Sequence, residues 1–212
     1  MNIKFLSSLL LSSSTFNLIE GHGYLKSPRS RNFYAHQEGV ESPVSGVPMR
    51  EYEPHSIDKL QGNQVCGSYR QNYDDYRDSR GNPMPWIPQA VYNEGDEIDI
   101  EVTLTKTHWG HIEIYVCPNG DASTQDCFLK NPATMVQDLK YNGPSDRQFP
   151  QRGYIGSPNA ETFRFKYQLP TGVTGNQVMM QWRYVTANSC LPKGYVSNNL
   201  YFIFSCPPIF IN

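Results

Sequence analysis

Residues 97–105 read Glu-Ile-Asp-Ile-Glu-Val-Thr-Leu-Thr, an almost strict alternation of polar and apolar side chains. Successive side chains of a β-strand point to opposite faces, so this stretch predicts a strand with one buried and one solvated face. The dipeptide Gly95-Asp96 just before it is typical of a turn. We therefore expect residues 97–105 to be a core strand of a β-protein.

Three further stretches of the chain have strand patterns, at residues 112–116, 163–167 and 178–185. Turn residues separate them, and no segment has a convincing amphipathic helical period. Residues 105–110 connect the first two strands, which we expect to run antiparallel. The sequence therefore predicts an all-β protein built as an immunoglobulin- or fibronectin-like β-sandwich.

The 212-residue chain shows no internal repeat, and beyond its N-terminal segment we expect one domain. Residues 22–85 lack periodicity but carry aromatic side chains that need burial, which predicts long irregular N-terminal loops and not a linker. Charged residues make up 18% of the chain, and the formal net charge is −2. This balance excludes the broad basic surface that nucleic-acid binding needs.

The first 21 residues differ in kind from the rest of the chain. Lys4 is the only charged residue before Glu20, and an apolar run follows it. This is typical of a secretory signal peptide, with Gly21 as the last residue before cleavage. The apolar run is too short to span a bilayer, and no later segment has the roughly 20 apolar residues that a span requires. We therefore expect a secreted protein without membrane attachment, whose mature chain begins at His22.

Secretion would place the five cysteines in an oxidising compartment. Cys117 and Cys127 flank a short turn-rich segment, which favours a disulfide between them. An odd count leaves one thiol without an intrachain partner, and the spacing does not say which one. The remaining cysteines are Cys66, Cys190 and Cys206.

A histidine at a mature N-terminus offers two nitrogen ligands, the α-amine and the ring Nδ1, which can chelate one metal ion. The amine has an ordinary pKa of about 7.7–8.0, so a metal displaces its proton readily. One further imidazole completes a site of three nitrogens, a set that favours Cu(II). His108 and His111 both lie in the connection after the first strand, where two strands hold a loop rigidly. One surface histidine and one packing histidine are an equal alternative there.

Other catalytic signatures do not occur in the sequence. It has no Gly-x-Ser-x-Gly, phosphate-loop, Cys-x-x-Cys or His-Glu-x-x-His motif. Acidic pairs such as Asp74-Asp75 exist, but polar loops often carry them, and a glycosidase dyad is a weak alternative. The histidines are the stronger candidates for chemistry.

Four stretches of the chain carry a family pattern in the right order. They are residues 22–32, which begin His-Gly and contain Pro-Arg-Ser-Arg; Cys66-Gly67; residues 105–114, with Cys117-Pro118 soon after; and residues 181–190, which end Asn-Ser-Cys. Together they resemble the lytic polysaccharide monooxygenases of the chitin-binding type-4 class, over about residues 22–195. The resemblance implies a secreted copper enzyme that oxidatively cleaves chitin or cellulose, uses an external electron donor and acts as a monomer.

The same resemblance implies a role for each site residue. His22 and His108 would bind one copper ion per chain as a histidine brace and form the catalytic centre. His111 would be a neighbour of that site and not a ligand, because the family often has tyrosine at this position. Tyr24 and Trp109 flank the two ligands in sequence and are expected to contact the polysaccharide, with core packing as an equal alternative.

The resemblance stops at Tyr195. Relatives end in a last strand that carries an aromatic residue axial to the copper, and no residue of this chain fits that register. The axial position therefore stays open, and we expect residues from Val196 onward not to be the native C-terminus of this fold. The nearby aromatic candidates are Tyr201, Phe202 and Phe204.

The chain accordingly divides into a signal peptide at residues 1–21, a copper monooxygenase domain at 22–195 and a divergent tail at 196–212. Two alternatives to the enzyme remain open. One is a non-catalytic carbohydrate-binding module that kept the fold, because the missing axial residue could abolish turnover and leave docking intact. The other is a copper-binding surface protein that uses the brace to handle metal.

Overall fold

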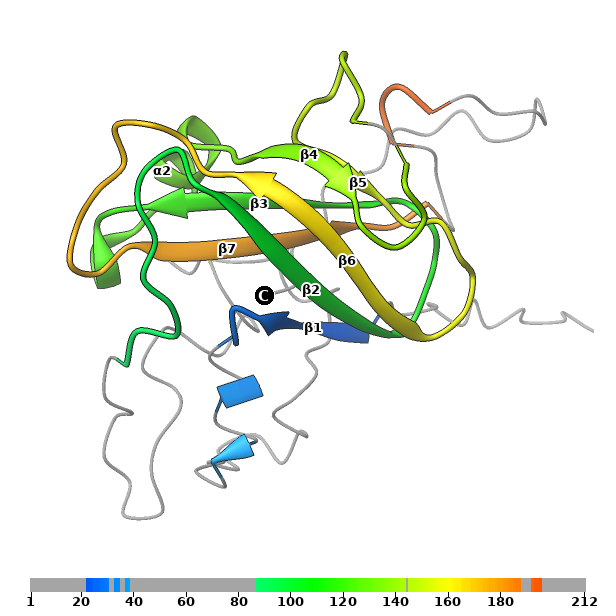
Figure 1. Ribbon diagram of the computed structural model, residues 1–212, viewed down its shortest axis with the longest axis horizontal. Helices are drawn as coiled ribbons and strands as arrows, with labels where there is room; N and C mark the ends of the chain where they lie inside the picture. Colours follow the sequence, from blue (N-terminus) through cyan, green and yellow to red (C-terminus); the bar gives the residue numbers. More distant parts are fainter. Residues whose placement is uncertain are drawn as a thin grey trace, which may run out of the picture.

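The computed structural model describes residues 22–30, 33–34, 37–38, 87–143, 145–187 and 192–195. Within these residues the strands form two antiparallel sheets that pack as a sandwich (Figure 1). This confirms the predicted all-β, immunoglobulin-like architecture. One sheet has the order β1 (His22–Ser27), β2 (Glu97–Lys106), β6 (Glu161–Gln168), β4 (Thr134–Asp138). The other has the order β5 (Gly153–Tyr154), β3 (His111–Cys117), β7 (Met179–Val185).

Strand β2 confirms the alternation that predicted it. Its apolar residues are buried, and Glu97 and Asp99 on the other face are exposed. β2 lies between β1 and β6, with Ile98 opposite Tyr167 and Val102 opposite Phe163. Full burial of one such side chain contributes roughly 1.5–3 kcal/mol. This central strand therefore anchors the sheet on which β1 begins.

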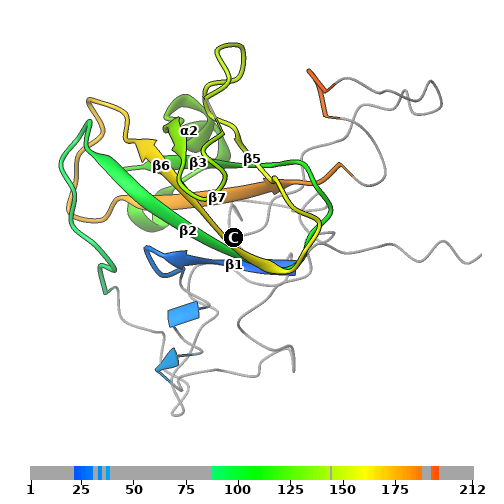
Figure 2. The ribbon, with the colours of Figure 1, turned by 45° about the vertical axis from the view of Figure 1, so that its right-hand side comes forward.

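Figure 2 shows the two sheets from a second direction. The core side chains fill the space between these sheets. Each sheet contributes the inward-facing half of its strands, as expected for a sandwich. The largest fully buried side chains on the strands are Trp182, Tyr167, Tyr184, Phe163 and Phe165.

Strands β2 and β3 do not pair with each other, although they are consecutive in the chain. β2 belongs to the four-stranded sheet and β3 to the three-stranded sheet. Residues 107–110 thus cross from one sheet to the other. Local alternation predicts a strand but not the sheet it joins, because that choice depends on partners far away in sequence.

All seven residues of β3 are buried, so both of its faces are covered. The alternation that predicted this strand places Ile112 and Ile114 on one face and Glu113 and Tyr115 on the other. It did not predict that the second face is also covered. On that face Tyr115 packs against Phe128 in a small second cluster. A buried carboxylate on this face needs charged partners, and these partners form part of the site below.

A short helix, α2 (Gln125–Lys130), follows the 3-10 turn η2 (Gly120–Ala122) and was not expected from the sequence. Its six residues are too few to show an amphipathic period. Thr124 caps it, because its side chain accepts a hydrogen bond from the Cys127 backbone N–H at 3.2 Å. The Cys117–Cys127 disulfide is confirmed, with a Cα–Cα distance of 5.6 Å, and it ties the end of β3 to this helix.

Among the described residues, no helix is both long and apolar enough to cross a membrane. Several predictions concern residues outside the described part of the chain. These are the signal peptide at 1–21, the tail at 196–212 with the axial candidates Tyr201, Phe202 and Phe204, the acidic pair Asp74-Asp75, and the cysteines Cys66, Cys190 and Cys206.

Candidate metal centre

Strand β1 brings the backbone of His22 to the end of β2. In the antiparallel β1–β2 pair, His22 lies opposite Lys106, the last residue of β2. The connection that carries His108 begins immediately after Lys106, so both predicted ligands come from the same end of the four-stranded sheet. The side chain of His22 lies outside what the structure describes.

Gly23 allows β1 to lie this close to β2. A Cβ atom at this position would come within 2.5 Å of the Thr103 carbonyl oxygen and 2.7 Å of the Leu104 Cδ2 atom. The β1–β2 register also shifts between His22 and Gly23. Any larger residue would push the start of β1 away from β2, so the His-Gly dipeptide fits a close approach of two backbones.

His108 is half-buried, and one of its ring nitrogens has no hydrogen-bond partner among the described residues. Its Nε2 atom is buried and makes no hydrogen bond within the described part of the chain. A buried polar atom without a partner costs about 1–3 kcal/mol, so such atoms call for a ligand, an ion or water. An imidazole nitrogen with a free lone pair is also what a metal ligand requires. The described atoms of His108 therefore fit a copper ligand.

Hydrogen bonds with β7 and the residues after it hold the loop around His108. Its backbone N–H donates to the Tyr184 hydroxyl at 2.7 Å, and that hydroxyl donates to the Trp109 carbonyl oxygen at 2.9 Å. The Ala187 N–H donates to the His108 carbonyl oxygen at 2.9 Å. Tyr184 and Ala187 belong to β7 and the residues after it, so the second sheet fixes a loop that starts from the first.

Trp109 and Gly110 complete this loop with left-handed backbone. Trp109 has φ +54° and Gly110 has φ +91°. A Cβ atom at Gly110 would lie 1.9 Å from the Val185 carbonyl oxygen, so only glycine fits there. The Trp109 side chain is 50% exposed. The structure thus places a large exposed aromatic side chain directly beside the predicted ligand His108.

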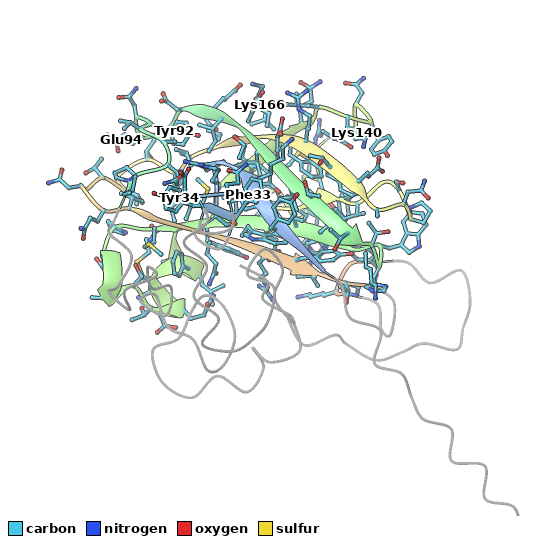
Figure 3. The ribbon with its side chains drawn as sticks, turned by 90° about the horizontal axis from the view of Figure 1, so that it is seen from below. Phe33, Tyr34, Tyr92, Glu94, Lys140 and Lys166 are labelled. Atoms are coloured by element: carbon cyan, nitrogen blue, oxygen red, sulfur yellow. A yellow bond between two sulfur atoms is a disulfide. The ribbon has the colours of Figure 1, made fainter. Side chains whose placement is uncertain are left out.

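Tyr24 packs differently from Trp109. It is half-buried, and its ring stacks on that of buried Phe33 with centroids 4.5 Å apart. Figure 3 labels Phe33, which lies close to β1. This is the packing alternative that the sequence left open for Tyr24. A contact of Tyr24 with polysaccharide stays a prediction, as does the same contact for Trp109.

His111 lies inside the protein, with both ring nitrogens facing protein groups. Its side chain is 1% exposed, Nδ1 lies 2.9 Å from the Tyr195 hydroxyl, and Nε2 lies 3.4 Å from Glu113 Oε1. Burial lowers the pKa of His111 below 6.5, against the opposing effect of Glu113. In the neutral ring, Nδ1 accepts a hydrogen bond from the Tyr195 hydroxyl, and Nε2–H points toward Glu113. With both nitrogens engaged, His111 has the geometry of a neighbour of the site.

Glu113 is the centre of a buried charge cluster that sequence reasoning missed. Arg183 lies opposite it on β7, with Nη1 3.2 Å from Oε2, and Tyr115 donates a hydrogen bond to the same oxygen at 2.8 Å. Burial would raise the pKa of Glu113, but the interactions with His111 and Arg183 outweigh it and lower the pKa to about 2. The only sequence signal was an acidic residue within an apolar strand.

No three His, Cys, Asp or Glu side chains lie together as a metal site within the described residues. The site that the sequence predicts at this end of the sandwich would instead include the main-chain amine of His22. The donor set would be that amine, the His22 ring and His108 Nε2, three nitrogens that favour copper.

Comparisons with known proteins bear on the family and the fold of this chain. A model of the family described as lytic polysaccharide mono-oxygenase, cellulose-degrading, matches residues 22–198. The solved structure of lytic polysaccharide monooxygenase AA15 from Thermobia domestica in the Cu(I) state is similar in fold. Its TM-score is 0.52 at 18% identity, over 89% of this chain and 93% of that chain. No curated protein sequence matches the chain significantly. Because the family model covers most of its length, the chain belongs to the lytic polysaccharide monooxygenase family.

Proposed function

We propose that this chain is a secreted, copper-dependent monooxygenase that cleaves glycosidic bonds of insoluble polysaccharide. The observation that carries the proposal is the buried Nε2 of His108, for which the described part of the chain offers no hydrogen-bond partner. It lies in a loop that leaves β2 next to the backbone of His22. Family membership supports the reaction class. The likeness to the Cu(I)-state structure supports the fold that would hold the metal.

In this proposal His22 holds copper through its α-amine and ring Nδ1, and His108 holds it through Nε2. When bound, copper supplies the one-electron chemistry by which hydrogen peroxide or O2 oxidises C1 or C4 of a glycosidic linkage. Hydrogen bonds with Tyr184 and Ala187 would keep His108 in place to hold the ion. Burial lowers the pKa of His111, and its ring lies inside the protein against Tyr195 and Glu113.

Trp109 is the best-placed residue for contact with the polysaccharide. It is half-exposed beside His108, and aromatic faces stack well on sugar rings. A formal net charge of −2 suits an uncharged glycan. The family description favours cellulose, and the chitin-binding type-4 resemblance keeps chitin as the second candidate.

The test is product analysis with the copper-loaded mature chain. Cellulose and chitin are each incubated with the protein, with and without ascorbate, and soluble products are analysed by mass spectrometry. We expect oxidised oligosaccharides only with ascorbate, from at least one of the two substrates. Metal-free protein and the His108→Ala variant serve as controls and should release none.

Two other outcomes would favour the alternatives. Tight binding to the solid without oxidised products, with fully copper-loaded protein, would indicate a carbohydrate-binding module. Copper binding without either attachment or products would indicate a copper-binding surface protein. Either result would overturn the proposed enzyme.

A further inference from the structure

The Tyr184 hydroxyl makes hydrogen bonds to two adjacent residues of the loop that carries His108. It accepts one from the His108 backbone N–H at 2.7 Å and donates one to the Trp109 carbonyl oxygen at 2.9 Å. A tyrosine hydroxyl has a single hydrogen to donate, and here that hydrogen and one lone pair are both used on this loop. The Tyr184 side chain is fully buried, so water does not compete for these bonds. One oxygen atom therefore clamps the loop.

The loop needs such a clamp because its backbone is disfavoured. Trp109 has φ +54°, a left-handed conformation that a residue with a Cβ atom rarely adopts. Backbone of this kind persists only where the surroundings hold it in place. Tyr184 bonds the backbone N–H of His108, which precedes Trp109, and the carbonyl oxygen of Trp109 itself. Gly110 packs against the backbone of Val185, the next residue of β7. β7 thus holds the loop along its length.

The clamp also links the two sheets. His22 begins β1 of the four-stranded sheet, whereas Tyr184 belongs to β7 of the three-stranded sheet. His108 lies in the connection between the sheets, and in sequence it is 76 residues away from Tyr184. The position of His108 relative to His22 therefore depends on how the crossing loop is fixed to β7.

We propose that Tyr184 is a positioning residue of the metal centre, which holds His108 and the exposed Trp109 in a fixed relation to His22. The inference rests on the proposed function for the identity of the metal. Tyr184 does not contact the metal in this scheme and acts only through the backbone of residues 108 and 109. Loss of its hydroxyl should loosen the loop, weaken copper binding and change the geometry of the bound ion.

Tyr167 offers a matched control for this role. It is also a fully buried tyrosine, and its hydroxyl lies 3.2 Å from the Ile112 carbonyl oxygen and 3.3 Å from that of Gln151. Tyr167→Phe therefore removes a buried hydroxyl of the same kind from the core without touching the loop at residues 108–110. A purely structural effect should be shared by Tyr167→Phe and Tyr184→Phe.

The experiment compares these two variants with the unaltered mature chain. Cu(II) is titrated calorimetrically, and the Cu(II) electron paramagnetic resonance spectrum is recorded at full loading. We expect Tyr184→Phe to weaken Cu(II) binding by about 10–100-fold, the usual cost of losing an outer partner of a metal ligand, and to alter the hyperfine splitting. Tyr167→Phe should keep both. Unchanged affinity and spectrum in Tyr184→Phe, or equal changes in both variants, would overturn the proposal.

A second measurement needs no copper. Amide hydrogen exchange of the metal-free chain reports directly on the His108 N–H. We expect this amide to be protected in the unaltered protein and to exchange at least about tenfold faster in Tyr184→Phe, while the amides of β3 change little. An unprotected His108 amide in the unaltered protein would refute the clamp even if the variant failed to fold. A protected amide together with no tight Cu(II) binding would instead refute the proposed function.

Discussion

His108 carries the most direct evidence for a metal at the scale of single residues, because its buried Nε2 lacks a partner in the described structure. We expect His108→Ala to lower Cu(II) affinity by several orders of magnitude, since a site of three nitrogens falls to two. His111→Ala should cost only about 10–100-fold, because His111 touches Tyr195 and Glu113 and not the metal. Calorimetric titration measures both, and the reverse ranking would contradict the ligand assignment.

Glu113 makes the free energy of unfolding depend on pH in the acid range. Its pKa is lowered from 4.5 to about 2, so its ion pairs contribute fully above about pH 4.5, and that contribution is lost as the pH falls toward 2. The difference corresponds to about 3 kcal/mol in the free energy of unfolding. His111 has a lowered pKa, so the unfolded chain takes up its proton first, and stability already begins to fall below about pH 6.5.

Urea denaturation between pH 7 and pH 3 measures these two steps. We expect Glu113→Gln to be destabilised by about 3–5 kcal/mol at pH 7, because Arg183 loses its buried partner, and to show a much smaller loss between pH 4.5 and 3. Glu97→Gln, at an exposed position of β2, is the matched control and should keep the full acid dependence. An acid profile of Glu113→Gln that parallels the unaltered protein would show that other carboxyl groups dominate.

At the scale of elements, the pairing of β1 with β2 fixes the position of His22, the residue at which the mature chain would begin. Gly23→Ala places a methyl group 2.5 Å from the Thr103 carbonyl oxygen, so β1 must move away from β2. We expect a loss of about 1–3 kcal/mol in the free energy of unfolding, together with weaker Cu(II) binding, since His22 moves with β1. Gly175→Ala is the control, because its nearest new contact would be an ordinary 3.5 Å. If Gly23→Ala kept both stability and copper affinity, the close approach would be unimportant.

The elements also show which features were predictable. Residues 97–105 alternate because β2 has one buried and one solvated face, so its pattern predicted the strand correctly. Helix α2 was missed because six residues are too short for a period, and its start depends on the Thr124 cap. β3 was assigned as a strand, but its second buried face was not predicted, since Arg183 reaches that face from β7 and Phe128 reaches it from helix α2.

At the scale of the whole molecule, the proposed site depends on processing of the chain. The amine of His22 is a ligand only if cleavage falls between Gly21 and His22. We expect the secreted protein to have the intact mass of a chain that begins at His22. A variant with one alanine inserted before His22 should fold normally by circular dichroism, bind Cu(II) much more weakly and release no oxidised oligosaccharides.

Enzymatic removal of the inserted alanine is the control for that experiment, because it restores the amine without any change to the fold. Copper affinity and activity should return together. A native secreted protein with any residue before His22, or an extended variant that is fully active, would contradict the brace. This prediction does not depend on Tyr184, whose hydroxyl bonds to the loop that carries His108 and not to His22.

The sequence alone was enough to predict strands β2, β3, β6 and β7 and the Cys117–Cys127 disulfide, because alternation and spacing are local properties of the chain. Strands β1, β4 and β5 were not predicted, and the copper ligands stay a prediction. Only the tertiary structure decided that β2 and β3 join different sheets and that His111 turns both ring nitrogens to protein groups. It also decided that the hydroxyl of Tyr184, 76 residues from His108 in sequence, bonds to the loop between β2 and β3. Such contacts are set by how two sheets pack, and local periodicity records which side of a strand is buried but not what covers it.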